Sequence, residues 1–171
     1  MSRARALATV SLLALIAAAL GWAERMIPFD TGLPGVKIGL ANLVIVLVLY
    51  IYGARRAFAV NMLRIAVAGL LFLGPSAFFF SLCGGVVSFL AMWALRRTGL
   101  FSLAGVSMAG GVFHNAGQLV VAGVYLGSWS VVYYLPVLIM TGAASGALLG
   151  VIAHIVLPRL RKALGSAGAL H

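Results

Sequence analysis

Few side chains in this sequence could take part in chemistry. Glu24 and Asp30 are its only carboxylates, and Cys83 is its only cysteine among 171 residues. Clustered acids hold magnesium against phosphate groups, and clusters of cysteine and histidine hold zinc, so the sequence predicts neither kind of metal site. The phosphate-binding pattern G-x-x-x-x-G-K-[ST] does not occur either. We therefore expect no catalysis, no metal and no cofactor, which makes binding or transport the default function.

Arg64 is the most informative single residue, because it lies in the middle of a long apolar segment. A charge at that depth in a membrane is costly, and such residues usually face a cavity, a partner or a pathway. Asn61 precedes it by three residues and would share its helical face. Arg64 could reach backbone carbonyls, the membrane surface or an acidic loop. Alternatively, its planar guanidinium could bind the carboxylate, phosphate or diphosphate of a ligand.

A second polar cluster, His114-Asn115-Ala116-Gly117-Gln118, lies in the middle of another apolar segment. His114 and Gln118 are four residues apart, so they share a helical face, and Asn115 lies beside it. Polar groups in hydrocarbon must be paired, either with another helix or with a ligand. Both interpretations stay open, and the second would place the cluster opposite Arg64.

The stretch 22–42 is the most polar part of the sequence and contains both acids, two prolines and three glycines. Prolines fix the backbone and glycines let it turn, so the pattern predicts an ordered external loop. One interpretation is an interfacial loop with a local ion pair, such as Glu24 with Arg25. The other is a lid over an outward-facing pocket, with Lys37 and Asn42 as polar contacts.

Membrane helices must position these residues. Hydrophobic residues make up 64% of the chain and charged residues only 8%, which is too few charges for the surface of a soluble domain and too little polarity for disorder. Six apolar segments approach the roughly 20 residues that a spanning helix needs. They are residues 5–23, 37–53, 57–73, 76–95, 101–126 and 132–157, the last ending at Pro158. We predict an all-α, six-helix transmembrane bundle in one domain, 1–164, with a short tail, 165–171.

The bases predict the orientation of this bundle. Only Arg25 and Lys37 fall on one side of a six-helix topology, and nine bases fall on the other. The nine are Arg3, Arg5, Arg55, Arg56, Arg96, Arg97, Arg159, Arg161 and Lys162. The side rich in bases, which holds both termini, should face the cytoplasm of a cell with this protein in its inner or plasma membrane. Their scatter in ones and twos argues against a nucleic-acid partner.

The first helix carries an alternative of its own. Residues 1–23 also resemble a signal peptide, with a basic start, an apolar run and small residues near Ala19 and Ala23. The apolar run is longer than the usual signal core, so we interpret it as a retained helix. Cleavage would leave five helices with the same orientation at the C-terminus.

Small residues at a spacing of four predict close packing between helices. Gly142, Gly146 and Gly150 form such a ridge on the sixth segment, where packing inside the bundle is the simpler interpretation. The first segment carries the same spacing in Ala4 with Ala8 and Ala14 with Ala18. That ridge could also pack internally, or it could be a docking face for a partner subunit.

Several motifs resemble one family, and they follow its order along the chain. They are P-G-V-K-I-G-L-A-N from Pro34, L-R at Leu63, S-L-C-G-G from Ser81, H-N-A-G-Q from His114 and Y-Y-L-P from Tyr133. In these motifs the sequence resembles the Gx transporter family, whose members are also labelled heptaprenyl diphosphate synthase component I. That family is similar to the substrate-binding S components of energy-coupling factor (ECF) transporters. The resemblance extends over residues 24–157.

The resemblance implies an S-component-like bundle that captures a small molecule from outside the cell. A membrane coupling subunit and two ATPases would then drive release, after docking through an A-x-x-x-A ridge on the first helix. The candidate substrate-binding residues are Lys37, Asn42, Asn61, Arg64, His114, Asn115 and Gln118. We expect an anionic or isoprenoid- or quinone-related substrate, and contact with membrane lipids.

A second hypothesis is a non-catalytic membrane component of heptaprenyl diphosphate synthesis, within isoprenoid or menaquinone metabolism. The same resemblance suggests it, through the family's other label. Arg64, Lys37 and Arg25 would suit a diphosphate in either role. Lys37 and Arg25 are predicted to be external, however, whereas prenyl diphosphates are made in the cytoplasm, so their position favours transport.

Overall fold

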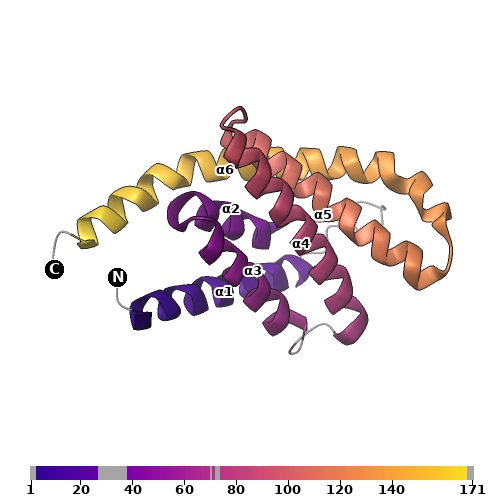
Figure 1. Cartoon of the computed structure of the whole chain (residues 1–171), viewed down its shortest axis with the longest axis horizontal. Coiled ribbons are helices and arrows are strands. Elements are labelled where there is room, and N and C mark those ends of the chain that lie inside the picture. The colour runs from indigo at the N-terminus through magenta and orange to yellow at the C-terminus, as the bar shows by residue number, and fades with distance from the viewer. Residues whose placement is uncertain (1–2, 27–37, 70, 72–73, 169–171) are drawn as a thin grey trace.

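The computed structural model describes residues 3–26, 38–69, 71 and 74–168, and within these ranges the chain is helical and contains no strand. The elements in chain order are α1 (Arg3–Met26), α2 (Leu40–Tyr52), α3 (Ala54–Ala68), α4 (Gly74–Thr98), α5 (Leu103–Leu126), the 3₁₀ helix η2 (Trp129–Tyr134) and α6 (Leu135–Gly168). Each predicted apolar segment corresponds to one α-helix, so the all-α prediction is confirmed. The start of α1 and the end of α6 lie at the same end of the molecule (Figure 1).

Three of these helices, α1, α4 and α6, contain stretches long and apolar enough to cross a membrane. The helices α2 and α3 have only 13 and 15 residues, short of the roughly 20 that span a bilayer. Helix α5 has 24 residues, but His114, Asn115 and Gln118 interrupt its apolar character. The coarse prediction of apolar helices fit for a membrane is thus confirmed, and six complete spans stay a prediction.

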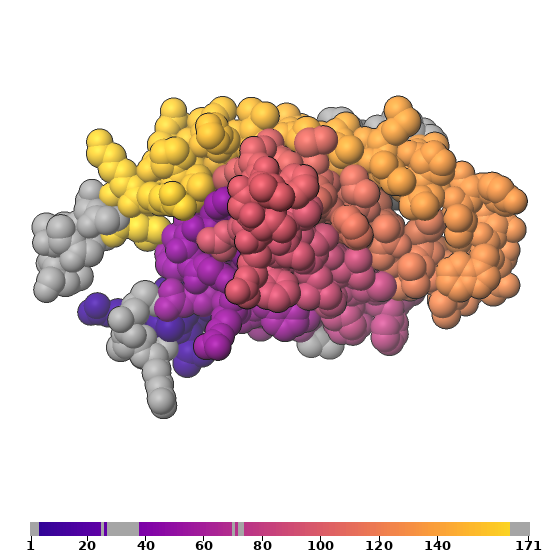
Figure 2. Space-filling view, turned by 45° about the horizontal axis from the view of Figure 1, so that its top comes forward, coloured from indigo at the N-terminus to yellow at the C-terminus, as the bar shows by residue number. Residues whose placement is uncertain are grey.

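The prediction that Pro158 ends the last helix is wrong. Helix α6 continues through Pro158 to Gly168 and runs the length of the molecule along one edge (Figure 2). A proline removes one N–H and one helical hydrogen bond, which kinks a helix without necessarily ending it. Here Ala153 and Leu157 hold the preceding turn in the core, and good helix formers from Arg159 to Leu164 continue it beyond the proline.

Helix α2 is the central helix of the bundle and contacts all five other α-helices. Apart from Asn42, its sequence, LANLVIVLVLYIY, is apolar on every face, the pattern of a helix surrounded by others. Ile45, Val46 and Leu49 are fully buried. Because α2 occupies the centre, side chains from several other helices can meet at each of its two ends.

Basic side chains from two other helices meet the C-terminal end of α2. Arg96 of α4 donates to the carbonyl of Leu49 and stacks over the ring of Tyr50, 4.8 Å from its centroid. Arg161 of α6 donates to the carbonyl of Tyr50 at 3.2 Å. These arginines supply donors and positive charge where a helix has free carbonyls and a partial negative charge. Two of the nine bases predicted to share one side of the bundle, Arg96 and Arg161, therefore meet here.

Glycines bring α5 and α6 into close contact. A Cβ on Gly142 would lie 2.8 Å from the carbonyl of Gly111, and one on Gly146 would lie 2.6 Å from the Cα of Met108. Neither position has room for a larger residue, because each faces the backbone of the neighbouring helix. The predicted ridge on α6 therefore packs inside the bundle, against α5.

Candidate functional site

A pocket of about 100 Å³ lies inside the bundle, and each of the six α-helices described contributes to its wall. Its polar lining residues are Glu24, Asn42, Arg64, Ser81, His114, Asn115, Gln118 and Ser145. Five of these eight were predicted from the sequence as substrate-binding residues: Asn42, Arg64, His114, Asn115 and Gln118. The tertiary structure thus brings together side chains from segments far apart in the chain.

Arg64 lies on the pocket wall, where a hydrogen bond to Asn61 orients its side chain. Its Nε donates to Oδ1 of Asn61 at 3.0 Å, and Nδ2 of Asn61 donates to the carbonyl of Gly85 on α4 at 2.9 Å. Asn61 is 1% exposed, so it supports Arg64 and does not itself line the pocket. Gly85 also lets α3 lie close to α4 here, since a Cβ on it would lie 2.6 Å from Cδ1 of Ile65. The planar guanidinium is thereby oriented with donors left for a ligand.

Glu24 is the residue that sequence reasoning misplaced. It was expected in an external loop, but it lies in the last turns of α1 and lines the same pocket as Arg64. Its two carboxylate oxygens accept from the backbone N–H groups of Gly39, at 2.6 Å, and Leu40, at 2.9 Å. These are free donors at the start of α2, where the helix dipole also favours a negative charge. Glu24 therefore ties α1 to α2 at the pocket.

The charges of Glu24 and Arg64 attract each other across this wall. Of the alternatives left open for Arg64, an acidic partner outside its own helix is therefore present, on α1. The proposed local pair with Arg25 lies outside what the structure describes, since the Arg25 side chain is not among the described ones. Lys37, the remaining candidate, also lies outside the described residues.

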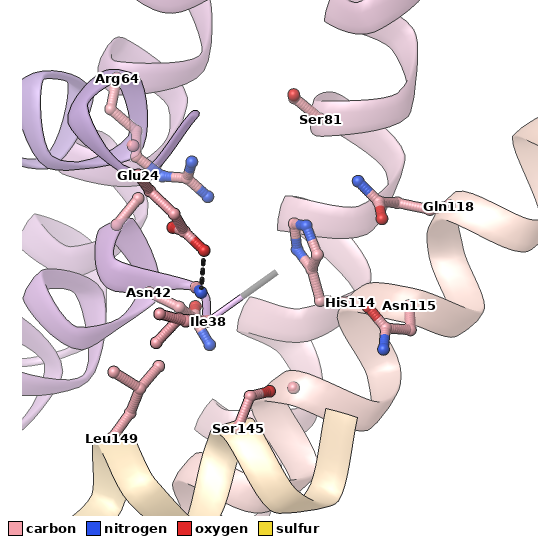
Figure 3. A pocket seen from close by; sticks show the side chains of 14 residues that line it. Glu24, Ile38, Asn42, Arg64, Ser81, His114, Asn115, Gln118, Ser145 and Leu149 are labelled. Carbon is pink, nitrogen blue, oxygen red and sulfur yellow. Dashed lines mark hydrogen bonds between the residues drawn. The ribbon is translucent and has the colours of Figure 1, made fainter. Parts of the chain in front are cut away.

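The polar cluster of α5 faces these charges. Figure 3 shows His114 and Gln118 on the side of the pocket opposite Arg64 and Glu24, the place that the ligand-binding interpretation of this cluster expects. Nδ2 of Asn115 donates to the carbonyl of Leu138 on α6 at 2.8 Å, so Asn115 also links two helices. The two interpretations of this cluster are therefore compatible, because one residue can pair with a neighbouring helix and still line the pocket.

A glycine of α4 lets the cluster and Ser81 share one space. A Cβ on Gly84 would lie 3.0 Å from Cγ of Gln118 and 3.1 Å from Cε1 of His114. Ser81 lies one turn before this contact and Ser145 enters from α6. Neither serine was predicted as a site residue. The only available signals were their places in the S-L-C-G-G motif and in the small-residue ridge of α6.

The pocket is suited to binding through hydrogen bonds and charge. Among the described residues, no group of three or more histidine, cysteine, aspartate or glutamate side chains could hold a metal ion. The polar groups of the wall comprise one guanidinium, one carboxylate, three amides, two hydroxyls and one imidazole. Such a set offers donors and acceptors from several directions, as sites for small polar ligands do.

The alanines proposed for docking divide into two pairs. Ala14 is 0% and Ala18 6% exposed, within the core formed by α1 and its neighbours, so this pair packs internally in this conformation. Ala4 and Ala8 are exposed on the first turns of α1. Docking of a partner therefore stays a prediction for Ala4 and Ala8 and does not suit the buried pair.

Together, these features define a class: an all-α protein with helices apolar enough to cross a membrane and a polar pocket within its bundle. Comparison with known proteins gives the family. Residues 13–156 match the family described as heptaprenyl diphosphate synthase component I, which is most of the chain. The chain belongs to this family. It matches no curated protein and no solved structure.

Proposed function

We propose that this protein is a non-catalytic membrane subunit that binds a small molecule for a transport system, in the manner of an S component. The observation that supports the proposal is the pocket, in which polar groups from all the described α-helices face one another inside an otherwise apolar bundle. Arg64 would bind an anionic group of the ligand bidentately. Asn42, His114, Asn115 and Gln118 would complete the contacts, and Asn61 would keep Arg64 oriented.

In this proposal the protein lies in the inner or plasma membrane with its basic end toward the cytoplasm. The pocket then opens toward the outside, near the N-terminal end of α2. An ECF coupling subunit and its ATPases would supply energy, since the chain has no nucleotide-binding loop of its own. These partners would contact the cytoplasmic end of α1.

A second candidate function is a membrane component of heptaprenyl diphosphate synthesis, which the description of the family favours. The pocket, at about 100 Å³, is far smaller than a heptaprenyl chain. An apolar groove of about 550 Å³ between α4 and α5, lined by residues such as Phe79, Val86 and Val121, could receive part of such a chain. In this role the protein would hold a product or anchor a soluble synthase.

Purification in mild detergent from the native host would separate the two functions. Mass spectrometry would identify the proteins and small molecules that remain bound. A coupling subunit with ATPases, and a small polar ligand, are the expected result. A soluble prenyl synthase together with a prenyl diphosphate would overturn the transport proposal in favour of the second function.

The docking part of the proposal has its own test. Substituting Ala4→Leu and Ala8→Leu together should reduce recovery of the coupling subunit at least tenfold, because leucines prevent close approach of a partner helix. The matched control is Leu160→Ala with Leu164→Ala on exposed positions of α6, away from the proposed docking face, which should leave association unchanged. Ligand retention should be unaffected in both. Full association of the leucine variant would remove the docking claim.

A further inference from the structure

The pocket wall carries two formal charges of opposite sign. Arg64 supplies the positive charge and Glu24 the negative one, and they act on each other electrostatically. The remaining polar lining consists of amides, hydroxyls and an imidazole. With the imidazole neutral, the described wall therefore has no net charge. An anion entering this pocket would therefore meet a carboxylate as well as an arginine.

Glu24 is fixed where it compensates this charge. Its carboxylate accepts from Gly39 N at 2.6 Å and Leu40 N at 2.9 Å, so it also neutralises the positive end of the α2 dipole. These bonds use two of about four acceptor positions on the carboxylate, and the bond to Asn61 uses one of the five N–H donors on Arg64. Both groups therefore keep the capacity to bind a ligand while staying in place.

The energetics of a weakly hydrated interior favour a ligand that satisfies both charges. A multiply charged anion would be repelled by Glu24, and removal of the carboxylate would leave two backbone donors at the start of α2 without partners. A ligand carrying only a positive charge would be repelled by Arg64. A small molecule with one group of each sign would pair with both residues without disturbing either.

We propose that Glu24 sets the charge selectivity of this pocket, so that it takes a small molecule with no net charge, which presents a negative group to Arg64 and an N–H donor to Glu24. Zwitterions are the chemical class that fits best, and diphosphates are excluded. This inference rests on the proposed function only in taking the pocket as the binding site. It narrows the earlier expectation of an anionic ligand to a ligand that has an anionic group.

Charge-reversing probes test this directly on the full chain in lipid nanodiscs. Calorimetry would measure the binding of inorganic pyrophosphate and of putrescine to wild type, Glu24→Gln, Arg64→Gln and the double variant. Glu24→Gln should bind pyrophosphate at least tenfold more tightly than wild type, because Arg64 and the start of α2 become uncompensated. Arg64→Gln should bind putrescine at least tenfold more tightly, and the double variant should gain neither.

The controls separate selectivity from folding. The amide oxygen introduced by Glu24→Gln can still accept one backbone N–H, so helix content by circular dichroism should match wild type. Arg97→Gln removes the same charge from the far end of α4, where Arg97 lies over the Trp93 ring, and should not gain putrescine binding. If Glu24→Gln binds pyrophosphate no more tightly than wild type, or wild type retains a diphosphate on purification, the inference is overturned. Recovery of transport partners would still leave the proposed function standing.

Discussion

The two ends of α2 are both stabilised by charged side chains from other helices, but only one of them lines the candidate binding pocket. At the C-terminal end, Arg96 and Arg161 donate to the last carbonyls of the helix. At the N-terminal end, Glu24 accepts from Gly39 and Leu40. Each charge opposes the partial charge of the helix end that it meets, as the helix dipole favours.

The two ends of α2 differ in the groups that lie beside the capping side chains. At the C-terminal end, Arg96 stacks on Tyr50 and Arg56 lies 5.6 Å from the centroid of Tyr52, so the cations rest on aromatic rings. At the N-terminal end, a second charge, Arg64, shares a cavity with the capping carboxylate. The same electrostatic rule therefore anchors a helix at one end and contributes to a pocket at the other. The N-terminal end differs because Glu24 and Arg64 line a cavity there and keep unused hydrogen-bonding positions.

The largest effect is expected from Arg64→Gln at the pocket end. It should weaken retention of the native ligand about 100-fold, because it removes the positive charge and the paired N–H donors for the ligand's anionic group. Mass spectrometry of the molecules retained after purification would measure this. Thermal stability should change little, since glutamine can still donate to Asn61.

Arg56→Gln at the basic end is the matched control and should retain the ligand as wild type does. If Arg64→Gln instead fails to fold while Arg56→Gln folds normally, Arg64 is a structural residue. Charged residues would then serve a structural role at both ends of α2.

Glu24→Ala should lower the free energy of unfolding by about 2 kcal/mol, because two backbone donors in a partly buried place lose a charged acceptor. Glu24→Gln should cost about half as much, since one acceptor oxygen remains. Unfolding in a denaturing detergent series would measure both. Equal stability of Glu24→Ala and wild type would show that the cap contributes nothing and that Glu24 serves the pocket alone.

The smallest effects are expected at the basic end. Arg96→Gln should lower the free energy of unfolding by about 1 kcal/mol, through loss of a helix-end hydrogen bond and a cation–aromatic contact. Arg161→Gln, at an exposed position with one such hydrogen bond, should change it by less than about 0.5 kcal/mol. Neither variant should alter ligand retention in the same assay. A loss of ligand in Arg96→Gln would mean that the two ends of α2 are coupled.

Much of the pocket could be predicted because polarity inside an apolar segment is a strong local signal. Arg64, His114 and Gln118 are costly in hydrocarbon wherever they lie, so their presence indicates a site or a partner. Glu24 carried no such signal, because it lies in a polar stretch that indicated a loop. Its place depends on how far α1 extends and on where α2 begins.

The alanines of α1 show the same limit. The spacing of Ala14 and Ala18 predicts a close helix contact but not its partner, and the structure finds that contact inside the bundle. The identity of the contacting helix depends on the apolar faces of several helices at once. No single segment contains that information.

By itself, the sequence determined the helices, their apolar character, the gathering of bases and the short set of polar residues that could form a site, because these depend on the composition and spacing of neighbouring residues. Only the tertiary structure decided which polar groups meet. Five helices pack around α2, glycines at 84, 85, 111 and 142 set how closely they approach, and α6 continues past Pro158. The pairing of Glu24 with the start of α2, opposite the α5 cluster, follows from that packing, since the positions of side chains across helices depend on all the contacts of the bundle together.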